Sequence, residues 1–296
     1  MNNHCLAIGL ALIFGLLLIE SSYASTQNLK QTDDGVIIRL QDGVLKLQVC
    51  SERIIRVLYD PSAMFKPVES LVVIKDWQHV PFEVRDSQTD VEVSTKKVMV
   101  RINRHSGAIS FYNMKGEVLI QENDIEPRVM TPAHFMGEDT YHAQLNLKFS
   151  KNEALYGLGQ HQDGMMNYRG YEVVLTQENT KIAIPFLIST RNYGILLDNY
   201  SKIIFHDKND SSYLWLEVAD VIDYYFIAGS DMDDVIRGYR EATGQAPLFG
   251  KWAYGYWQSK ERYKTQRELL EIAREYRQRK IPIDNIIQDW QYWGED

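Results

Sequence analysis

Between residues 35 and 226 the chain repeats short alternations of hydrophobic and polar positions, separated by turn signals. Val44–Val49 alternates strictly after the turn Gln41-Asp42-Gly43, and 97–102 alternates again before the turn His105-Ser106-Gly107. Closely spaced strands with glycine-containing turns are typical of an antiparallel sandwich or barrel. The pattern predicts strands over 36–40, 44–49, 54–59, 91–94, 97–102, 108–112, 171–175, 182–189, 193–198, 203–205 and 222–227.

The pattern changes after residue 229. Residues 231–244 predict a short helix, because acidic side chains fill its first turn and Gly244 suits a C-cap. Pro247 prevents any continuation of that helix. We therefore expect a front domain over 25–229 and a helical connector over 230–250.

Residues 251–296 carry a different pattern, which predicts a strand, a helix and a second strand. An aromatic strand is expected over 252–257. A helix follows, starting at the N-cap Thr265 with Glu268 completing a capping box. Its apolar positions recur at helical spacing, Pro282 stops it, and 283–288 predicts the second strand. A connection of this length implies a parallel βαβ unit.

Asp289 is the candidate site residue that this pattern favours most, because it follows the second strand. In a (β/α) barrel, chemistry is found at the carboxyl ends of strands, and a carboxylate there accepts hydrogen bonds from hydroxyl groups of a ligand. Trp257 and Trp290 are the aromatic candidates for substrate binding, since indole rings pack against apolar ligand faces. The alternatives stay open: a solvated or helix-capping Asp289, and tryptophans that merely fill the core.

An apolar run over 6–19 opens the chain and is too short for an ordinary membrane-spanning helix. Ser22-Tyr23-Ala24 follows with small residues at the spacing that signal peptidase prefers. We expect a signal peptide over 1–24, cleavage after Ala24, and a secreted or periplasmic protein without a membrane partner. An uncleaved anchor or a buried helix is the alternative.

Composition excludes several classes of function. Only Cys50 remains after cleavage, so no intrachain disulfide is expected, and Cys50 has no neighbours at metal-ligand spacing. A net charge of −8 with both signs interspersed argues against a nucleic-acid partner. No phosphate-binding loop is present in the sequence, and we expect no metal and no organic cofactor.

The motif Gln288-Asp289-Trp290 with Tyr292-Trp293, together with Leu155–Gln160, resembles glycoside hydrolase family 31, nearest the bacterial α-xylosidase type. The resemblance covers essentially the whole mature chain. It implies a mutarotase-like, antiparallel β-sandwich followed by the start of a (β/α)8 TIM barrel, which is incomplete in this chain. Gln291 stands where α-glucosidase-like relatives have a second aspartate, which favours the xylosidase type.

The resemblance implies a retaining α-glycosidase, an α-xylosidase ahead of an α-glucosidase, acting on α-xylosylated plant-wall oligosaccharides. Its nucleophile and acid/base aspartates are expected beyond Asp296, so no catalytic residue is assigned here and this chain alone is expected to be inactive. Asp289 would bind hydroxyls of the terminal sugar without taking part in bond cleavage. The alternative from a different class is a non-catalytic carbohydrate-binding module.

Overall fold

The computed structural model describes residues 29–64 and 69–290. They fall into two compact units, one ending at Thr243 and the other beginning at Gly244. The division lies inside the predicted connector, and each unit is described by itself. The predicted signal peptide, Gln291 and the pair Tyr292-Trp293 lie outside the described residues.

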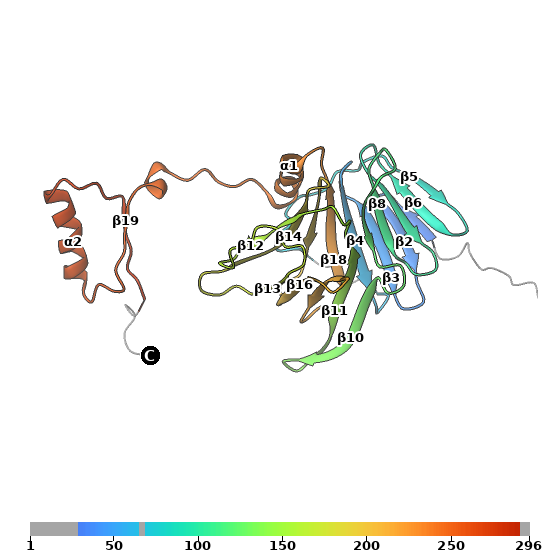
Figure 1. The fold of residues 1–296 in the computed structure, drawn as a ribbon, viewed down its shortest axis with the longest axis horizontal. Coiled ribbons are helices and arrows are strands. Elements are labelled where there is room, and N and C mark those ends of the chain that lie inside the picture. The colour runs from blue at the N-terminus through green and yellow to red at the C-terminus, as the bar shows by residue number, and fades with distance from the viewer. Residues whose placement is uncertain (1–28, 65–68, 291–296) are drawn as a thin grey trace, which may run out of the picture. The chain divides into compact units, whose positions relative to one another are not determined.

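The first unit is a sandwich of two antiparallel sheets (Figure 1). The first sheet has eight strands in the order β1-β2-β3-β4-β18-β15-β14-β12. Its strands are β1 (Leu29–Thr32), β2 (Gly35–Arg39), β3 (Val44–Val49), β4 (Ile54–Asp60), β12 (Leu155–Gln160), β14 (Ile182–Ser189), β15 (Tyr193–Leu197) and β18 (Ile222–Ala228).

The second sheet has ten strands, nine of them in the order β13-β16-β17-β11-β9-β8-β7-β6-β5, with β10 pairing on β11. Its strands are β5 (Glu83–Asp86), β6 (Asp90–Ser94), β7 (Met99–Asn103), β8 (Ile109–Tyr112), β9 (Val118–Glu122), β10 (Arg128–Phe135), β11 (Glu138–Lys148), β13 (Glu172–Leu175), β16 (Ile203–Lys208) and β17 (Ser211–Leu216).

Alternating side chains of both sheets fill the space between them. Val36, Leu45 and Val57 point inward from the first sheet, and Val100 and Phe205 do so from the second. The predicted antiparallel sandwich is therefore confirmed, and each predicted strand lies within a few residues of an observed one. Seven observed strands were not predicted: β1, β5, β9, β10, β11, β12 and β17.

A buried ion pair crosses this core. Arg128 Nη1 lies 3.0 Å from Glu122 Oε2, and the two side chains are 2% and 1% exposed. Tyr224 Oη donates to Glu122 at 2.9 Å, and the Ile109 amide donates to the same carboxylate at 2.9 Å. The carboxylate is thus bonded on both oxygens, as a buried charge requires.

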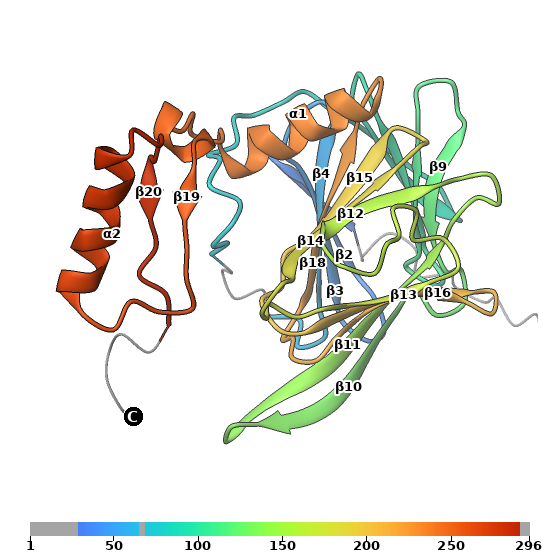
Figure 2. The same cartoon turned by 60° about the vertical axis from the view of Figure 1, so that its left-hand side comes forward.

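A helix covers the outer face of the first sheet (Figure 2). α1 (Met232–Thr243) packs Val235 against a second hydrophobic cluster that includes Ile54 and Ile227. Gly238 lies so close to Ile227 that a Cβ would stand 2.4 Å from its Cγ2. Arg53 ties the helix down through ion pairs to Asp234 and Glu241, at 2.6 and 3.0 Å. The predicted helix over 231–244 is confirmed.

The hairpin of β10 and β11 was not predicted from the sequence. It extends beyond the rest of the second sheet (Figure 2) and is mostly exposed over Thr131–Glu138. Its strands mix polar and apolar residues without clean alternation, and Pro132 interrupts the pattern that marks a strand. The long hairpin is stabilised by pairing along eight residues of each strand.

The second unit holds η1 (Lys251–Tyr254), β19 (Trp257–Gln258), α2 (Gln266–Gln278) and β20 (Asn285–Ile286). β19 precedes α2 in the sequence and β20 follows it, and the two strands pair with each other in parallel. The predicted βαβ order is therefore confirmed. The predicted strand over 252–257 was wrong in extent. Residues 251–254 form a 3₁₀ turn instead, closed by hydrogen bonds from Ala253 N and Gly255 N.

The start of α2 follows the predicted cap in part. Thr265 Oγ1 accepts from Glu268 N at 3.1 Å, as an N-cap does. The Glu268 carboxylate returns to the amide of Lys264, at 2.9 Å, rather than to that of Thr265. The cap is therefore built from the predicted residues, with the reciprocal bond shifted by one position.

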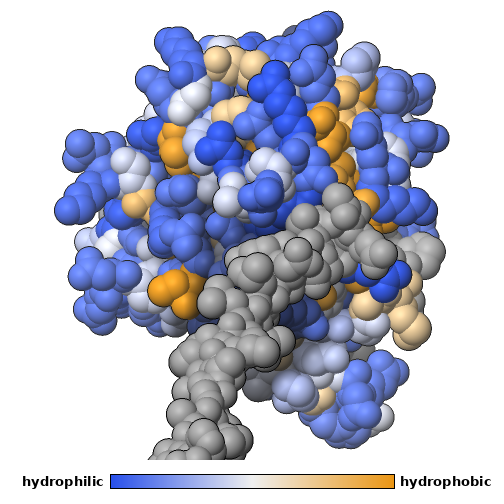
Figure 3. Space-filling view, turned by 90° about the vertical axis from the view of Figure 1, so that its right-hand side faces the viewer, coloured by the Kyte–Doolittle hydropathy of each residue, from blue (hydrophilic) through white to orange (hydrophobic). Residues whose placement is uncertain are grey.

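One face of the molecule is mostly hydrophilic, with hydrophobic side chains in small groups (Figure 3). Such scattered groups are normal for a solvated surface. Within residues 29–64 and 69–290 the structure contains no helix that is long and apolar enough to cross a membrane. Cys50 is buried as a free thiol, and burial raises its pKa to about 12.

Candidate functional site

The strands of the second unit separate their side chains onto two faces. Gln258 points to α2, because its Oε1 accepts from Tyr276 Oη at 2.5 Å and its Nε2 donates to Tyr263 Oη at 3.2 Å. Trp257 and Asn285 are opposite each other in the ladder, one residue out of phase with Gln258. They therefore face away from the helix, because neighbouring strand residues point to opposite faces.

Asp289 follows the second strand on the same face as Trp257. Ile287 N extends the ladder by donating to Gln258 O at 2.9 Å, and Gln288 Nε2 donates to Tyr263 O at 3.1 Å, on the helix side. The next residue, Asp289, is directed to the opposite side by the same alternation. By this alternation Asp289, which lies just beyond the carboxyl end of β20, is directed to the same side of the ladder as Trp257.

The Asp289 carboxylate is half-buried and keeps hydrogen-bonding capacity. Oδ1 accepts from the amide of Trp290 at 2.8 Å, whereas Oδ2 bonds to no described residue. A carboxylate oxygen without a partner can accept a hydrogen bond from a ligand hydroxyl. The geometry fits a ligand-binding aspartate that is oriented by its own backbone.

The two candidate tryptophans are half-exposed, at 44% for Trp257 and 50% for Trp290. Trp257 Nε1 donates to Ala253 O at 3.1 Å, so this indole offers a ligand its ring surface. The Trp252 ring lies 6.0 Å away and supports it. Neither candidate ring is core within its unit, and both remain available to an apolar or sugar face.

Asp284 has a structural role at the start of β20. It accepts from the amide of Tyr256 at 3.0 Å, and a Cβ on Gly255 would lie 2.0 Å from its Oδ2. It stands at the amino end of the ladder, away from Asp289. The glycine is needed because the carboxylate occupies the space that a side chain would take.

In the sandwich, His161 follows the glycine-rich turn of β12. Leu158 has a φ of +62° and is buried at 1% exposure, beside a register shift between Gly157 and Gly159. His161 Nε2 lies 2.9 Å from Leu158 O, and its ring meets Tyr168 edge-on. His161 is thus held by its own loop, which favours a structural role over a ligand contact.

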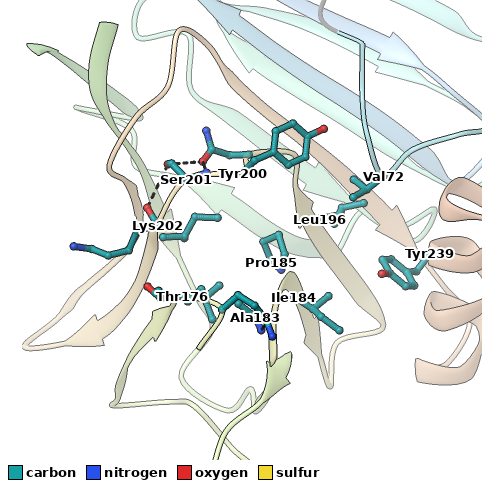
Figure 4. Close-up of a pocket in the computed structure, with 14 residues that line it drawn as sticks. Val72, Thr176, Ala183, Ile184, Pro185, Leu196, Tyr200, Ser201, Lys202 and Tyr239 are labelled. Carbon is teal, nitrogen blue, oxygen red and sulfur yellow. Dashed lines mark hydrogen bonds between the residues drawn. The ribbon is translucent and has the colours of Figure 1, made fainter. Parts of the chain in front are cut away.

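A cavity of about 450 Å³ opens at the edge of the sandwich (Figure 4). Leu196, Pro185 and Ile184 form its apolar floor, and Tyr239 of α1 borders it. Ser201 Oγ is already engaged with Asn199 Oδ1 at 2.7 Å. Because its walls are largely apolar, the cavity suits an apolar group better than a polyhydroxylated one. No sequence pattern marked it, since its residues come from five separated segments.

Among the described residues, no three His, Cys, Asp or Glu side chains gather in an arrangement that could hold a metal ion. The ladder and helix of the second unit are arranged as in the opening of a barrel, with one carboxylate and two indoles at the end where such proteins bind ligands. Together with a two-sheet sandwich, this defines the class: a β-sandwich protein followed by a βαβ unit of the TIM-barrel type.

Two family models match the chain. The glycosyl hydrolase 31 N-terminal galactose mutarotase-like domain matches residues 44–205, and the glycosyl hydrolases family 31 TIM-barrel domain matches residues 246–296. The chain belongs to glycoside hydrolase family 31. The predicted family and fold class are both confirmed.

The chain is 37% identical over 261 residues to an α-xylosidase of Saccharolobus solfataricus, covering 84% of this chain and 35% of that protein. It is 27% identical over 269 residues to α-glucosidase 2 of Bacillus thermoamyloliquefaciens, covering 84% and 32%. The chain therefore spans about a third of the length of these relatives.

Among solved structures, the fold is similar to that of a family 31 α-xylosidase from a soil metagenome, complexed with xylose. The TM-score is 0.82 at 25% identity, and the match covers 90% of this chain and 42% of that one. Homologues named α-xylosidase and α-glucosidase are thus similar to this chain in sequence, and an α-xylosidase is similar to it in fold.

Proposed function

We propose that this chain belongs to an exported, retaining α-glycosidase, and that its substrate is an α-xylosylated oligosaccharide of the plant cell wall. The observation that carries the proposal is the half-buried Asp289 at the carboxyl end of the β19–β20 ladder, on the face it shares with Trp257. The 37% identity to an α-xylosidase favours xylose over glucose in the terminal position. α-Glucosidase activity is the second candidate, supported by the relative of that name.

In this proposal Asp289 accepts hydrogen bonds from hydroxyls of the terminal sugar, and the rings of Trp257 and Trp290 pack against its C–H face. None of the three breaks a bond. A retaining mechanism requires two carboxylates about 5–5.5 Å apart, one as nucleophile and one as acid/base. We assign those two to barrel strands outside residues 1–296, within a longer protein whose domains are divided as predicted at 229 and 250.

Export is proposed from the apolar run over 6–19 and the small residues before Ser25, which lie outside the described residues. N-terminal sequencing of the secreted protein tests it. A first residue of Ser25 supports cleavage after Ala24. A retained N-terminus would make the run an anchor.

The substitution Asp289→Ala in the full-length enzyme tests the site. Loss of a hydrogen-bond acceptor that acts in the transition state costs about 10²–10³-fold in kcat, by analogy with other preorganised polar groups. The assay is hydrolysis of aryl α-xylosides and aryl α-glucosides, compared as kcat/KM. The matched control is Glu261→Ala, an exposed carboxylate on the loop before α2.

Parental turnover by the Asp289→Ala enzyme would remove Asp289 from the site. A faster reaction with the aryl α-glucoside than with the α-xyloside would replace the xylosidase proposal by the glucosidase one. Both outcomes leave the membership in family 31 intact, since that rests on the matched models.

A further inference from the structure

The outer face of the second sheet carries a cluster of aromatic, imidazole and amide side chains over β11, β16 and β17. The alternate residues of these strands, such as Leu145, Phe205 and Leu214, are buried between the sheets. The remaining side chains therefore point outward. We call them the aromatic face, defined by His142, Gln144, Asn146, His206, Tyr213 and Trp215.

Strand register places these residues in rows. His206, Tyr213 and Asn146 are opposite one another across three strands, and Trp215 is opposite Gln144 in the next row. The His206 and Tyr213 rings stack at 4.6 Å with an interplanar angle of 8°. Packing of this kind fixes the side chains before any ligand arrives, which lowers the entropy cost of binding.

The aromatic face keeps hydrogen-bonding groups that are not engaged. Tyr213 Oη, Trp215 Nε1 and the Nε2 atoms of His142 and His206 bond to no described residue. The other nitrogen of each histidine is used: His142 Nδ1 lies 2.6 Å from Glu217 O. The rings are thereby oriented, while their outer atoms stay available to donate or accept.

Charges on this surface are paired. Lys202 Nζ lies 3.1 Å from Glu217 Oε1, and His206 Nδ1 lies 2.8 Å from Glu172 Oε2. Lys202 also lies 5.8 Å from the centre of the Trp215 ring. A surface whose charges are internally matched complements an uncharged ligand rather than a nucleic acid or an anion.

The other half of the same sheet provides the comparison. There the corresponding row across β6, β7, β8 and β9 reads Glu92, Arg101, Ser110 and Gln121. Those side chains satisfy one another, with Arg101 bonded to Glu92 at 3.2 Å and Gln121 to Ser110 at 3.2 Å. That half has the composition of a solvated face, and the aromatic face differs from it within one sheet.

Within residues 29–64 and 69–243, the helix α1 lies on the opposite sheet and leaves the aromatic face uncovered. In Figure 2, β13 and β16 lie in the lower layer of the sandwich, and the hairpin of β10 and β11, which belongs to the same sheet, extends below them. The aromatic rings can pack against C–H faces of a ligand, and their O–H and N–H groups can hydrogen-bond to hydroxyls at the edge of those faces. We propose that the aromatic face binds neutral polysaccharide, separately from the Asp289 site.

Native gel electrophoresis of the 296-residue chain in gels containing soluble xyloglucan tests this proposal. The choice of xyloglucan rests on the proposed function, so parallel gels contain dextran or soluble starch. We expect retardation by at least one of these polymers, weakened at least tenfold by Trp215→Ala or by His142→Ala. The matched control is Tyr112→Ala, a tyrosine on the outer face of the solvated half.

The proposal would be overturned if Trp215→Ala and His142→Ala were both retarded as strongly as the parent. It would also be overturned if none of the three polymers retarded the parent. Loss of retardation in Trp257→Ala alone would move the binding to the second unit, which supports the proposed function and overturns this site. Melting curves are recorded for each variant. His142→Ala, which deletes only a half-exposed outer side chain, decides the case if Trp215→Ala unfolds.

Discussion

Replacing Arg128 by methionine is the most demanding test of the sandwich core. Methionine retains an unbranched, apolar stem and removes the guanidinium charge, so the Glu122 carboxylate is left buried at 1% exposure without a cation. Tyr224 Oη and the Ile109 amide still donate to it. The carbonyl of Gly107 loses the donor that Arg128 supplies at 2.6 Å. Breaking a buried pair in this way costs about 3–5 kcal/mol.

Urea unfolding followed by far-UV circular dichroism measures the loss, because the sandwich contributes most of the strand signal. At an m-value of about 2–3 kcal/mol/M, the midpoint falls by roughly 1–2.5 M. The control Arg101→Met breaks a pair with Glu92 in which the arginine is 42% exposed, and it should cost about 0–1 kcal/mol. Adding Glu122→Gln to Arg128→Met should restore part of the loss, since no buried charge remains. A shift of Arg128→Met no larger than that of Arg101→Met would refute the reasoning.

Three further outcomes are expected. Gly159→Ala should destabilise the sandwich by more than Gly116→Ala, measured by urea unfolding. Both glycines have a positive φ, at +100° and +79°, but only at Gly159 would a Cβ meet a backbone oxygen, at 1.9 Å. The control Gly116→Ala should lose only the free energy that alanine costs in the left-handed conformation, about 1–2 kcal/mol. Thr265→Ala should remove about 0.5–2 kcal/mol from α2, read as faster amide exchange in its first turn. Asp207→Asn should lose stability relative to the parent, and the gap in Tm should narrow as the pH falls below about 4.

The sign of the last effect follows from the groups around Asp207. Burial opposes its ionisation, but hydrogen bonds from Ser212, Gly170 and Arg169 hold its pKa below the ordinary value of 3.8. A lowered pKa in the folded state stabilises the protein above the unfolded pKa, and this contribution disappears as pH falls through the folded one. A Tm difference between parent and Asp207→Asn that widens in acid would contradict this sign. Equal losses of stability in Gly159→Ala and Gly116→Ala would contradict the predicted backbone clash at Gly159. Unchanged amide exchange in the first turn of α2 would contradict the capping role of Thr265.

Regular periodicity made most of the sandwich predictable from the sequence. Strands such as Val44–Val49 alternate cleanly because one of their faces is buried, and they were found nearly to the residue. The hairpin of β10 and β11 was missed because it is exposed beyond the core on both faces for much of its length, so no hydrophobic alternation is imposed on it. Hydrophobic alternation arises where one face of a strand is buried, and an exposed hairpin therefore shows none.

The candidate site was predictable only in part. Asp289 was predicted from its position after an apolar strand, and its role in binding stays a prediction; β19 and β20 do form the predicted parallel pair just before it. The aromatic face could not be found, because His142, His206 and Trp215 come from three strands that join only through long-range register. Local sequence carries no record of which strands become neighbours.

The position of β18 has a consequence for synthesis of the chain. β18, all of whose residues are buried, pairs with β4 on one side and β15 on the other, although β4 ends at Asp60 and β18 begins only at Ile222. At about 5–20 residues per second, a ribosome needs roughly 10–30 s to make the intervening segment. Throughout that time the edge of β4 has no native partner. The first sheet can therefore be completed only when nearly all of the first unit has been synthesised.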